Sequence, residues 1–406
     1  MSTDTVDLTR LTDPLNRADP YPVLRELALA SPSRTAEGLM LIGRHADCSA
    51  VLRHPAMSSE RERARLSPNA KGPRTRNFLH LDPPDHTRLR RLVVKAFTPR
   101  VVAALEPRIR GAADELFSEA AAKGRFEVVS DLAYPLPLRI MCELLGVPFA
   151  DRYLIQDWSA KLSEALEPPL PGLVAPRATA QAAQARAEFI QYFRDLIAER
   201  RTDPRDDLVS QLVRVEESGD RLDEHELLAT CILLINAGHE TTVNLISNGV
   251  LALLRHPDQL ELLRRQPELS GQTVEEVLRY DAPVQVTSRV AREPVALSGS
   301  HAQEGDFLVL LLGAANRDPD VFPDPDRFDI LRPTGAPHLS FSAGPHFCLG
   351  AGLARLEVRI AFELFASRMV NPRLAAAGLS YKPNLSLRGP DRLEVAYEGI
   401  RPAETE

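Results

Sequence analysis

The stretch F-S-A-G-P-H-F-C-L-G, from Phe341 to Gly350, places one cysteine, Cys348, in a loop punctuated by glycines. The run that follows, A-G-L-A-R-L-E-V-R-I-A-F-E-L-F-A, has its apolar residues at helical spacing. A thiolate at the start of a helix faces unpaired backbone N–H groups and the positive end of the helix dipole, which stabilise the anion. Gly344 and Gly350 allow the backbone to approach a flat, bulky group closely and to take conformations that other residues resist. The loop suits a cysteine that ligates such a group, and a buried, inert cysteine is the alternative.

Length and composition describe an ordinary globular chain of 406 residues, 44% hydrophobic and 26% charged. The formal net charge of -7 argues against a nucleic-acid-binding protein. The four cysteines show neither C-x-x-C spacing nor a disulfide-like cluster, which fits a reduced cytosol. The N-terminal residues M-S-T-D-T-V-D-L-T-R contain no signal-peptide core. We therefore expect a cytoplasmic protein.

The longest apolar run, Leu227 to Leu254, is interrupted by polar residues that would be costly in lipid: Asn236, His239, Glu240, Asn244 and Asn248. This pattern predicts a long helix buried inside the protein, not a membrane span.

A-G-H-E-T-T, from Ala237 to Thr242, lies at the centre of that helix. Gly238 and Thr241 can loosen the helical ladder and leave a notch, because a threonine hydroxyl can bond back to a carbonyl. Glu240 followed by Thr241 is a plausible proton-delivery pair beside such a notch. A hydrated structural kink is the alternative.

Two further segments carry charged pairs at helical spacing. In D-P-P-D-H-T-R-L-R-R, His86 and Arg90 stand four apart and share a helix face, which suits an anionic group such as a carboxylate or is a solvated basic face. In V-E-E-V-L-R-Y, Glu276 and Arg279 stand three apart and can form an ion pair, although such pairs are common on helix surfaces.

Taken together and in order, these motifs resemble the cytochrome P450 family of haem-thiolate monooxygenases, of the soluble bacterial type. The resemblance covers essentially the whole chain and includes P-D-R-F, from Pro325 to Phe328, before the cysteine loop. The loop itself matches the family's F-x-x-G-x-x-x-C-x-G pattern. The resemblance implies a mainly α fold with small β-sheets, a triangular single-domain prism over residues 1–406. Haem would lie between the long central helix and the helix after the cysteine loop.

The resemblance also implies a role for each matching residue. Cys348 would be the axial thiolate ligand of haem b, in a loop shaped by Phe341, Gly344 and Gly350. Ser342 stands where the family often has glycine, and we expect this departure to matter little. Glu240 and Thr241 would deliver protons for oxygen activation. The remaining cofactor-binding residues would be Ala237 and Gly238 beside the haem and His86, Arg90, Arg289 and His346 at its propionates, with Glu276, Arg279 and Arg327 in a buried structural network.

The implied activity is hydroxylation or epoxidation of a lipophilic small molecule such as a polyketide, terpenoid or steroid, with O2 and electrons derived from NAD(P)H. At this length we expect no reductase fused to the haem domain, so a ferredoxin and a ferredoxin reductase would supply the electrons to a monomeric protein, with Lys95, Arg355 and Arg359 as candidate docking residues. Oxidative coupling on the same fold, or a non-catalytic haem protein that recruits a partner or senses a gas, are the alternatives. The expected substrate-facing positions are the loop 58–77, a lid over 166–178, Ile235, Ala237, Val284, Thr287, Leu385 and Leu387.

Overall fold

The structure is a computed structural model that describes residues 7–11, 13–66, 77–163, 180–214, 216–217, 220–333, 335–375 and 378–403. It is mainly helical with small sheets, as the sequence predicts. The helices are α1 Pro14–Arg17, α2 Tyr21–Leu29, α3 His45–Arg53, α4 Asp85–Val93, α5 Pro99–Ala104, α6 Glu106–Lys123, α7 Pro135–Leu145, α8 Arg152–Ser163, α9 Ala180–Thr202, α10 Leu208–Arg214, α11 Glu224–Arg255, α12 Pro257–Arg265, α13 Ser270–Tyr280, α14 Leu312–Ala315 and α15 Ala351–Arg368.

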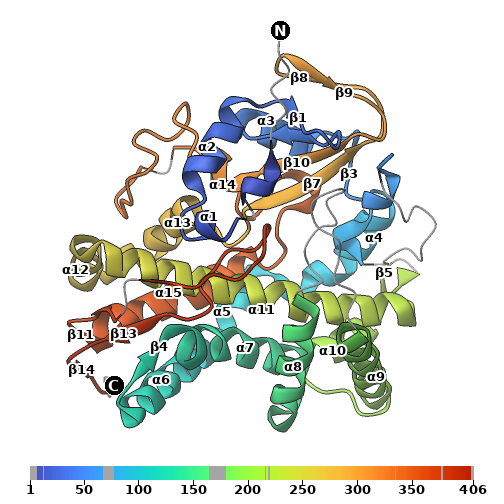
Figure 1. The fold of residues 1–406 in the computed structure, drawn as a ribbon. Helices are drawn as coiled ribbons and strands as arrows, with labels where there is room; N and C mark the ends of the chain where they lie inside the picture. The colour runs from blue at the N-terminus through green and yellow to red at the C-terminus, as the bar shows by residue number, and fades with distance from the viewer. Residues whose placement is uncertain are drawn as a thin grey trace.

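Helix α11 is the long helix that the apolar run predicts, and it crosses the middle of the molecule (Figure 1). It begins with a capping box. The Asp223 side chain accepts a hydrogen bond from the Glu226 N–H at 2.8 Å, and the Glu226 side chain accepts one from the Asp223 N–H at 3.0 Å. Most of its residues are buried, and it packs against α7, α13 and α15. Within the described residues, we find no helix whose length and apolarity would let it cross a membrane.

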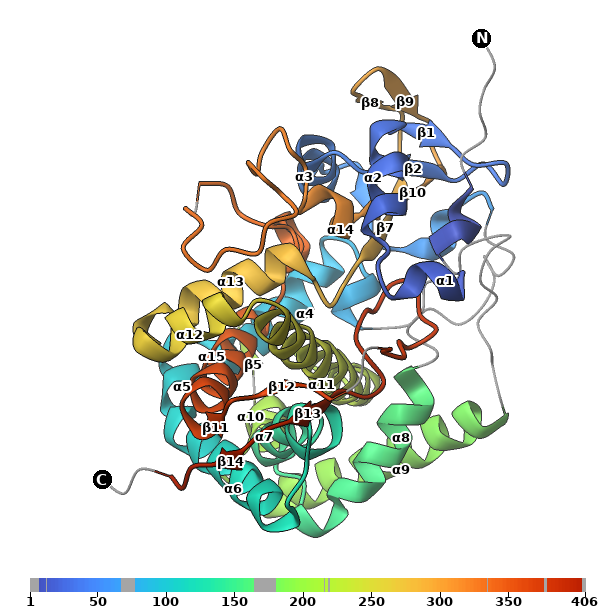
Figure 2. The same ribbon diagram turned by 60° about the vertical axis from the view of Figure 1, so that its left-hand side comes forward.

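The largest sheet has the strand order β1-β2-β10-β7-β3 and lies on one side of α11, with α6 to α10 on the other (Figure 1). Strand β10 pairs in parallel with β2 and antiparallel with β7. Figure 2 shows α15 beside α11, so the cysteine loop that precedes α15 is set close to the centre of the fold. The strands are β1 Ser33–Arg34, β2 Met40–Ile42, β3 Met57–Ser58, β4 Phe126–Glu127, β5 Glu216–Glu217, β6 Asp220–Arg221, β7 Val286–Ala291, β8 Val295–Leu297, β9 Ser300–Ala302, β10 Phe307–Leu311, β11 Met369–Val370, β12 Arg373–Leu374, β13 Glu394–Ala396 and β14 Gly399–Ile400.

An ion pair between Glu276 and Arg279 on α13 ties this helix to the irregular chain that leads to the cysteine loop. Arg279 donates two hydrogen bonds of 2.8 Å to the Glu276 carboxylate, and both side chains are 3% exposed. The remaining Arg279 N–H groups reach backbone carbonyls of Asn316, Pro325 and Arg327, at 2.8 to 3.3 Å. A bidentate pair whose spare donors are all used can offset the cost of burying two charges.

The third member of this network is Arg332, and the prediction that the Arg327 side chain joins it is wrong. Arg327 contributes only its carbonyl oxygen, while its side chain is 66% exposed and lies 3.5 Å from Asp329. The Arg332 Nε lies 3.2 Å from the Glu276 carboxylate, and its other nitrogens donate to the carbonyls of Pro323, Asp324 and Arg327. The chain turns between the two arginines, so the later one points inward.

Replacing Arg332 with alanine should lower the free energy of unfolding by about 2 kcal/mol, because a hydrogen bond to a buried charged group contributes about 1.5–3 kcal/mol. The matched variant Arg327→Ala should change it by less than about 0.5 kcal/mol, as is usual for an exposed side chain. Urea unfolding followed by circular dichroism measures both. Equal losses in the two variants would contradict the assignment.

Candidate active site

The cysteine loop places the Cys348 sulfur at the start of α15. The Cys348 N–H donates to the Phe341 carbonyl at 2.9 Å, which closes the loop. Burial raises the pKa of the Cys348 thiol, while a hydrogen bond from the Gly350 backbone and the charges of Arg90 and Arg355 act in the opposite direction. Cys348 is a half-buried residue, and the groups around its sulfur include several that favour an anion.

The glycines of this loop differ in what they contribute. Gly344 has a φ of 67°, and a Cβ there would lie 2.6 Å from the Leu52 carbonyl oxygen, so only glycine fits. Gly350 has an ordinary φ of -84°, and the prediction that it needs a special conformation is wrong. No protein atom in the described structure would lie within 4 Å of a Cβ at Gly350, so space is open beside it.

Ser342 affects the backbone of the cysteine loop more than the sequence predicts. It has a φ of 61°, in the left-handed region that glycine adopts without strain. Its hydroxyl is also buried without a hydrogen-bond partner in the described structure. The departure from glycine therefore puts strain into the loop, contrary to the prediction that it has little effect.

Positive and potentially positive side chains from three separate segments meet near the loop. The rings of His86 on α4 and His346 lie in contact, with centroids 4.2 Å apart and planes tilted by 42°. Both ring nitrogens of His86 are buried without a partner among the described residues. Arg289 on β7 is buried, and desolvation together with the charge of Arg61 lowers its pKa to about 10, with Asp82 opposing. The fourth predicted member, Arg90, donates to the Phe347 carbonyl at 2.6 Å.

Sequence reasoning missed two members of this cluster, Arg61 and His80. Burial, together with the charges of Arg61 and Arg289, lowers the pKa of His80 to about 3. The Arg61 Nε donates to the Ser288 hydroxyl at 3.1 Å, which holds the guanidinium beside β7. Arg61 lies within the loop 58–77, which the sequence assigns to the substrate side, and His80 follows shortly after it. No motif marks either residue as a partner of an anionic group. We call Arg61, His80, His86, Arg90, Arg289 and His346 the cationic cluster.

One stripe of α11 is open although the helix around it is buried. Ala237 is exposed and Leu233 and Thr241 are half-buried, at a spacing of four residues that puts them in line. The Thr241 hydroxyl donates to the Ala237 carbonyl at 2.7 Å, and the Thr242 hydroxyl donates to the Gly238 carbonyl at 2.8 Å. These bonds leave α11 continuous, without the break that a notch would require.

Glu240 does not share this open stripe. Its carboxylate is buried and forms an ion pair with Lys382, which the sequence pattern did not single out. Lys382 comes from the segment Ser380–Gly389 near the C-terminus, far from α11 in the chain.

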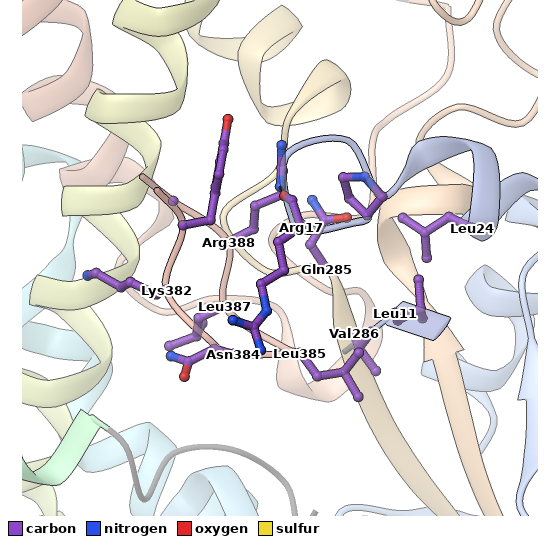
Figure 3. A pocket seen from close by; sticks show the side chains of 13 residues that line it. Leu11, Arg17, Leu24, Gln285, Val286, Lys382, Asn384, Leu385, Leu387 and Arg388 are labelled. Atoms are coloured by element: carbon purple, nitrogen blue, oxygen red, sulfur yellow. Dashed lines mark hydrogen bonds between the residues drawn. The ribbon is translucent and has the colours of Figure 1, made fainter. Parts of the chain in front are cut away.

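The predicted substrate-facing residues lie in different environments. Ile235 is fully buried in the main core and faces away from the open stripe, so this prediction is wrong. Val284 and Thr287 are half-buried. Leu385 and Leu387 line a pocket between the N-terminal and C-terminal segments (Figure 3). The lid predicted over 166–178 and the loop residues 67–76 lie outside the described residues.

Two of the three predicted docking residues already have acidic partners. Arg355 binds the Glu275 carboxylate through two nitrogens at 2.6 and 3.0 Å. Arg359 pairs with Glu106 at 2.6 Å and with Glu363 at 2.8 Å. Lys95 is exposed. The face behind the cysteine loop is therefore less basic than the sequence indicates.

Comparison with known proteins identifies the family. The family profile described as Cytochrome P450 matches residues 35–368. The solved structure of ligand-free CYP164A2 from Mycobacterium smegmatis is 44% identical, with a TM-score of 0.90 over 96% of this chain and 99% of that chain. The cytochrome P450 monooxygenase PikC of Streptomyces venezuelae is 42% identical over 95% of this chain and 93% of that protein. The vitamin D(3) 25-hydroxylase of Pseudonocardia autotrophica is 41% identical over 93% of each. The chain therefore belongs to the cytochrome P450 family and is a monooxygenase, an oxidoreductase that incorporates oxygen from O2 and carries a haem-thiolate iron.

Proposed function

We propose that the protein binds haem b between α11 and the loop before α15, with Cys348 as axial ligand, and hydroxylates a lipophilic small molecule. The observation that carries this proposal is the cationic cluster beside the Cys348 loop, in which both His86 nitrogens are buried without a partner in the described structure. Haem presents carboxylates that such donors bind well. The space beside Gly350 and the open stripe of α11 also suit a flat group.

Each predicted residue then has a task at the haem. His86, Arg289 and His346 would donate to the propionates, with Arg61 and His80 as additional donors. Arg90, which contacts the loop at Phe347, would support both the propionates and the sulfur. Phe341 and Gly344 would fix the loop, and Ala237 and Gly238 would flank the haem on the α11 side.

When bound, a haem with a thiolate ligand supplies the activation of O2. Inserting one oxygen atom into a substrate and reducing the other to water consumes protons as well as electrons. The Thr241 hydroxyl, now bonded to the Ala237 carbonyl, can turn to donate into the space over the open stripe. Glu240 would supply protons to that side of α11.

We also propose a substrate class and redox partners. Leu385 and Leu387 on their pocket, together with Leu233 and Ala237 on α11, are apolar and favour a polyketide, terpenoid or steroid. The relative that hydroxylates vitamin D(3), a lipophilic molecule, supports this class. We further propose that residues 1–406 form one haem domain and that a ferredoxin and its reductase supply the electrons.

Replacing Cys348 with alanine should abolish the thiolate-type absorption band of the reduced, CO-bound protein, because the band depends on a sulfur ligand. Cys142→Ala, which removes a buried thiol of α7, is the control and should keep the band. A thiolate band that survives Cys348→Ala, or a wild-type protein without one, would overturn the haem assignment.

Replacing Arg289 with leucine should speed haem release to apomyoglobin by roughly tenfold, because hydrogen bonds to charged groups contribute about 1.5–3 kcal/mol. The stability of the haem-free protein should not fall, since the variant removes a charge that burial disfavours. Arg292→Leu, an exposed neighbour that donates to the Pro55 carbonyl, should release haem at the wild-type rate. Unchanged release from Arg289→Leu would contradict a propionate contact.

A lipophilic compound that shifts the spin state of the ferric protein should become hydroxylated with ferredoxin, its reductase and NADPH, because Leu233, Ala237, Leu385 and Leu387 offer it apolar contacts. Mass spectrometry under 18O2 should find the heavy isotope in the product. A coupled product without added oxygen would instead favour oxidative coupling.

A further inference from the structure

We propose that Lys382 is a positioning residue that holds Glu240 away from the open stripe of α11 and governs when this carboxylate can deliver a proton. This inference rests on the proposed function, since it concerns the proton supply of that reaction. It adds a residue from the C-terminal segment to the proton-delivery pair that the sequence indicates.

The geometry of α11 places the acid and the alcohol of the pair on different sides. Successive residues of a helix lie about 100° apart around its axis. Thr241 lies on the open stripe with Ala237, whereas the Glu240 carboxylate is buried against the segment Ser380–Gly389. Glu240 must therefore turn away from Lys382 before a proton on its carboxylate can reach the Thr241 side.

Lys382 is well placed to control that turn. Its Nζ bonds Glu240 Oε1 and lies 3.5 Å from the Asn244 Oδ1, one helical turn further along α11. Figure 3 shows the Lys382 side chain extending from its segment toward the helix, away from Leu385. The side chain of Lys382 is 21% exposed and that of Glu240 is 8% exposed, so the lysine connects the carboxylate with solvent.

The segment that carries Lys382 is itself fixed in place. At Gly389 it lies so close to α11 that a Cβ would meet Asn244 Oδ1 at 2.3 Å. The next residue back, Arg388, pairs with Asp281 at 2.7 Å and donates to the carbonyls of Arg17 and Ala18. The segment that carries Lys382 is thus fixed against α11 and against the N-terminal part of the chain, which holds the lysine beside Glu240.

Electrostatics explains why the Glu240–Lys382 ion pair should be stable when it is formed and why it can still separate. A buried carboxylate costs several kcal/mol unless a cation or hydrogen bonds accompany it. Among the described residues, Lys382 is the hydrogen-bond partner of the Glu240 carboxylate, and His239 and Tyr134 are neighbours that its charge influences. The partial exposure of Lys382 gives its ammonium group access to water, which can replace the carboxylate as a partner when the pair separates.

The test compares Lys382→Met, Glu240→Gln and the double variant in the haem-loaded enzyme. If Lys382 acts through Glu240, Lys382→Met should raise the share of NADPH electrons lost as hydrogen peroxide several-fold when substrate is saturating. The double variant should be no worse than Glu240→Gln alone. Lys382→Arg should restore most of the coupling, because it keeps the cation. Full coupling in Lys382→Met, or additive losses in the double variant, would overturn the proposal.

A second readout does not depend on turnover. Thermal unfolding of the ferric protein should show that the shifts in midpoint from Lys382→Met and Glu240→Gln are not additive, as expected for two groups in contact. Arg392→Met removes an exposed ion pair with Glu394 near the same segment and should change neither the midpoint nor the coupling. If the wild type yields no hydroxylated product, the proposed function fails, whereas additive midpoint shifts would refute the Lys382–Glu240 contact itself.

Discussion

Buried positive charge needs a negative partner, and this constraint governs the region in front of the cysteine loop. The cationic cluster draws its members from the chain around Arg61, from α4, from β7 and from the loop at His346. Desolvation, and then repulsion by the neighbouring positive charges, lowers the pKa values of His80, His86 and His346. A dianionic group placed among them would turn this cost into binding free energy, which is why the fold can keep them there.

Helix α11 has to satisfy two requirements that oppose each other. It has to be apolar enough to form the centre of the core, yet it also carries an acid, an alcohol and several amides. The structure separates these demands by face. The stripe at Leu233, Ala237 and Thr241 is left open, while Glu240 is turned toward Lys382 on a neighbouring face of the helix.

Much of the fold could be predicted, because long helices are set by local patterns. The apolar run from Leu227 predicts α11 to within a few residues at each end. The loop motif predicts Cys348 at the start of α15. Ile235 was assigned to the wrong face because residues two apart on a helix point in nearly opposite directions, so it cannot share a surface with Ala237.

The parts that could not be predicted depend on contacts between distant segments. Lys382 reaches α11 only after the chain has folded back from its C-terminal region, and no local pattern marks it. The choice of Arg332 over Arg327 depends on how an irregular turn is folded, and the two arginines look equivalent in the sequence. Arg61 and His80 became meaningful only once β7 brought Arg289 beside them.

The pairing of strands also bears on how the protein is made. Strand β2 needs β10, with Met40 opposite Leu308, and β4 needs β13, with Phe126 opposite Val395. A ribosome adds roughly 5–20 residues per second, so these early strands wait many seconds for partners that have not yet been synthesised. Such non-local pairing slows folding and leaves strand edges open to other chains in the meantime. Production of this protein should therefore depend more on chaperones that cover the open strand edges during synthesis than on the intrinsic stability of its helices.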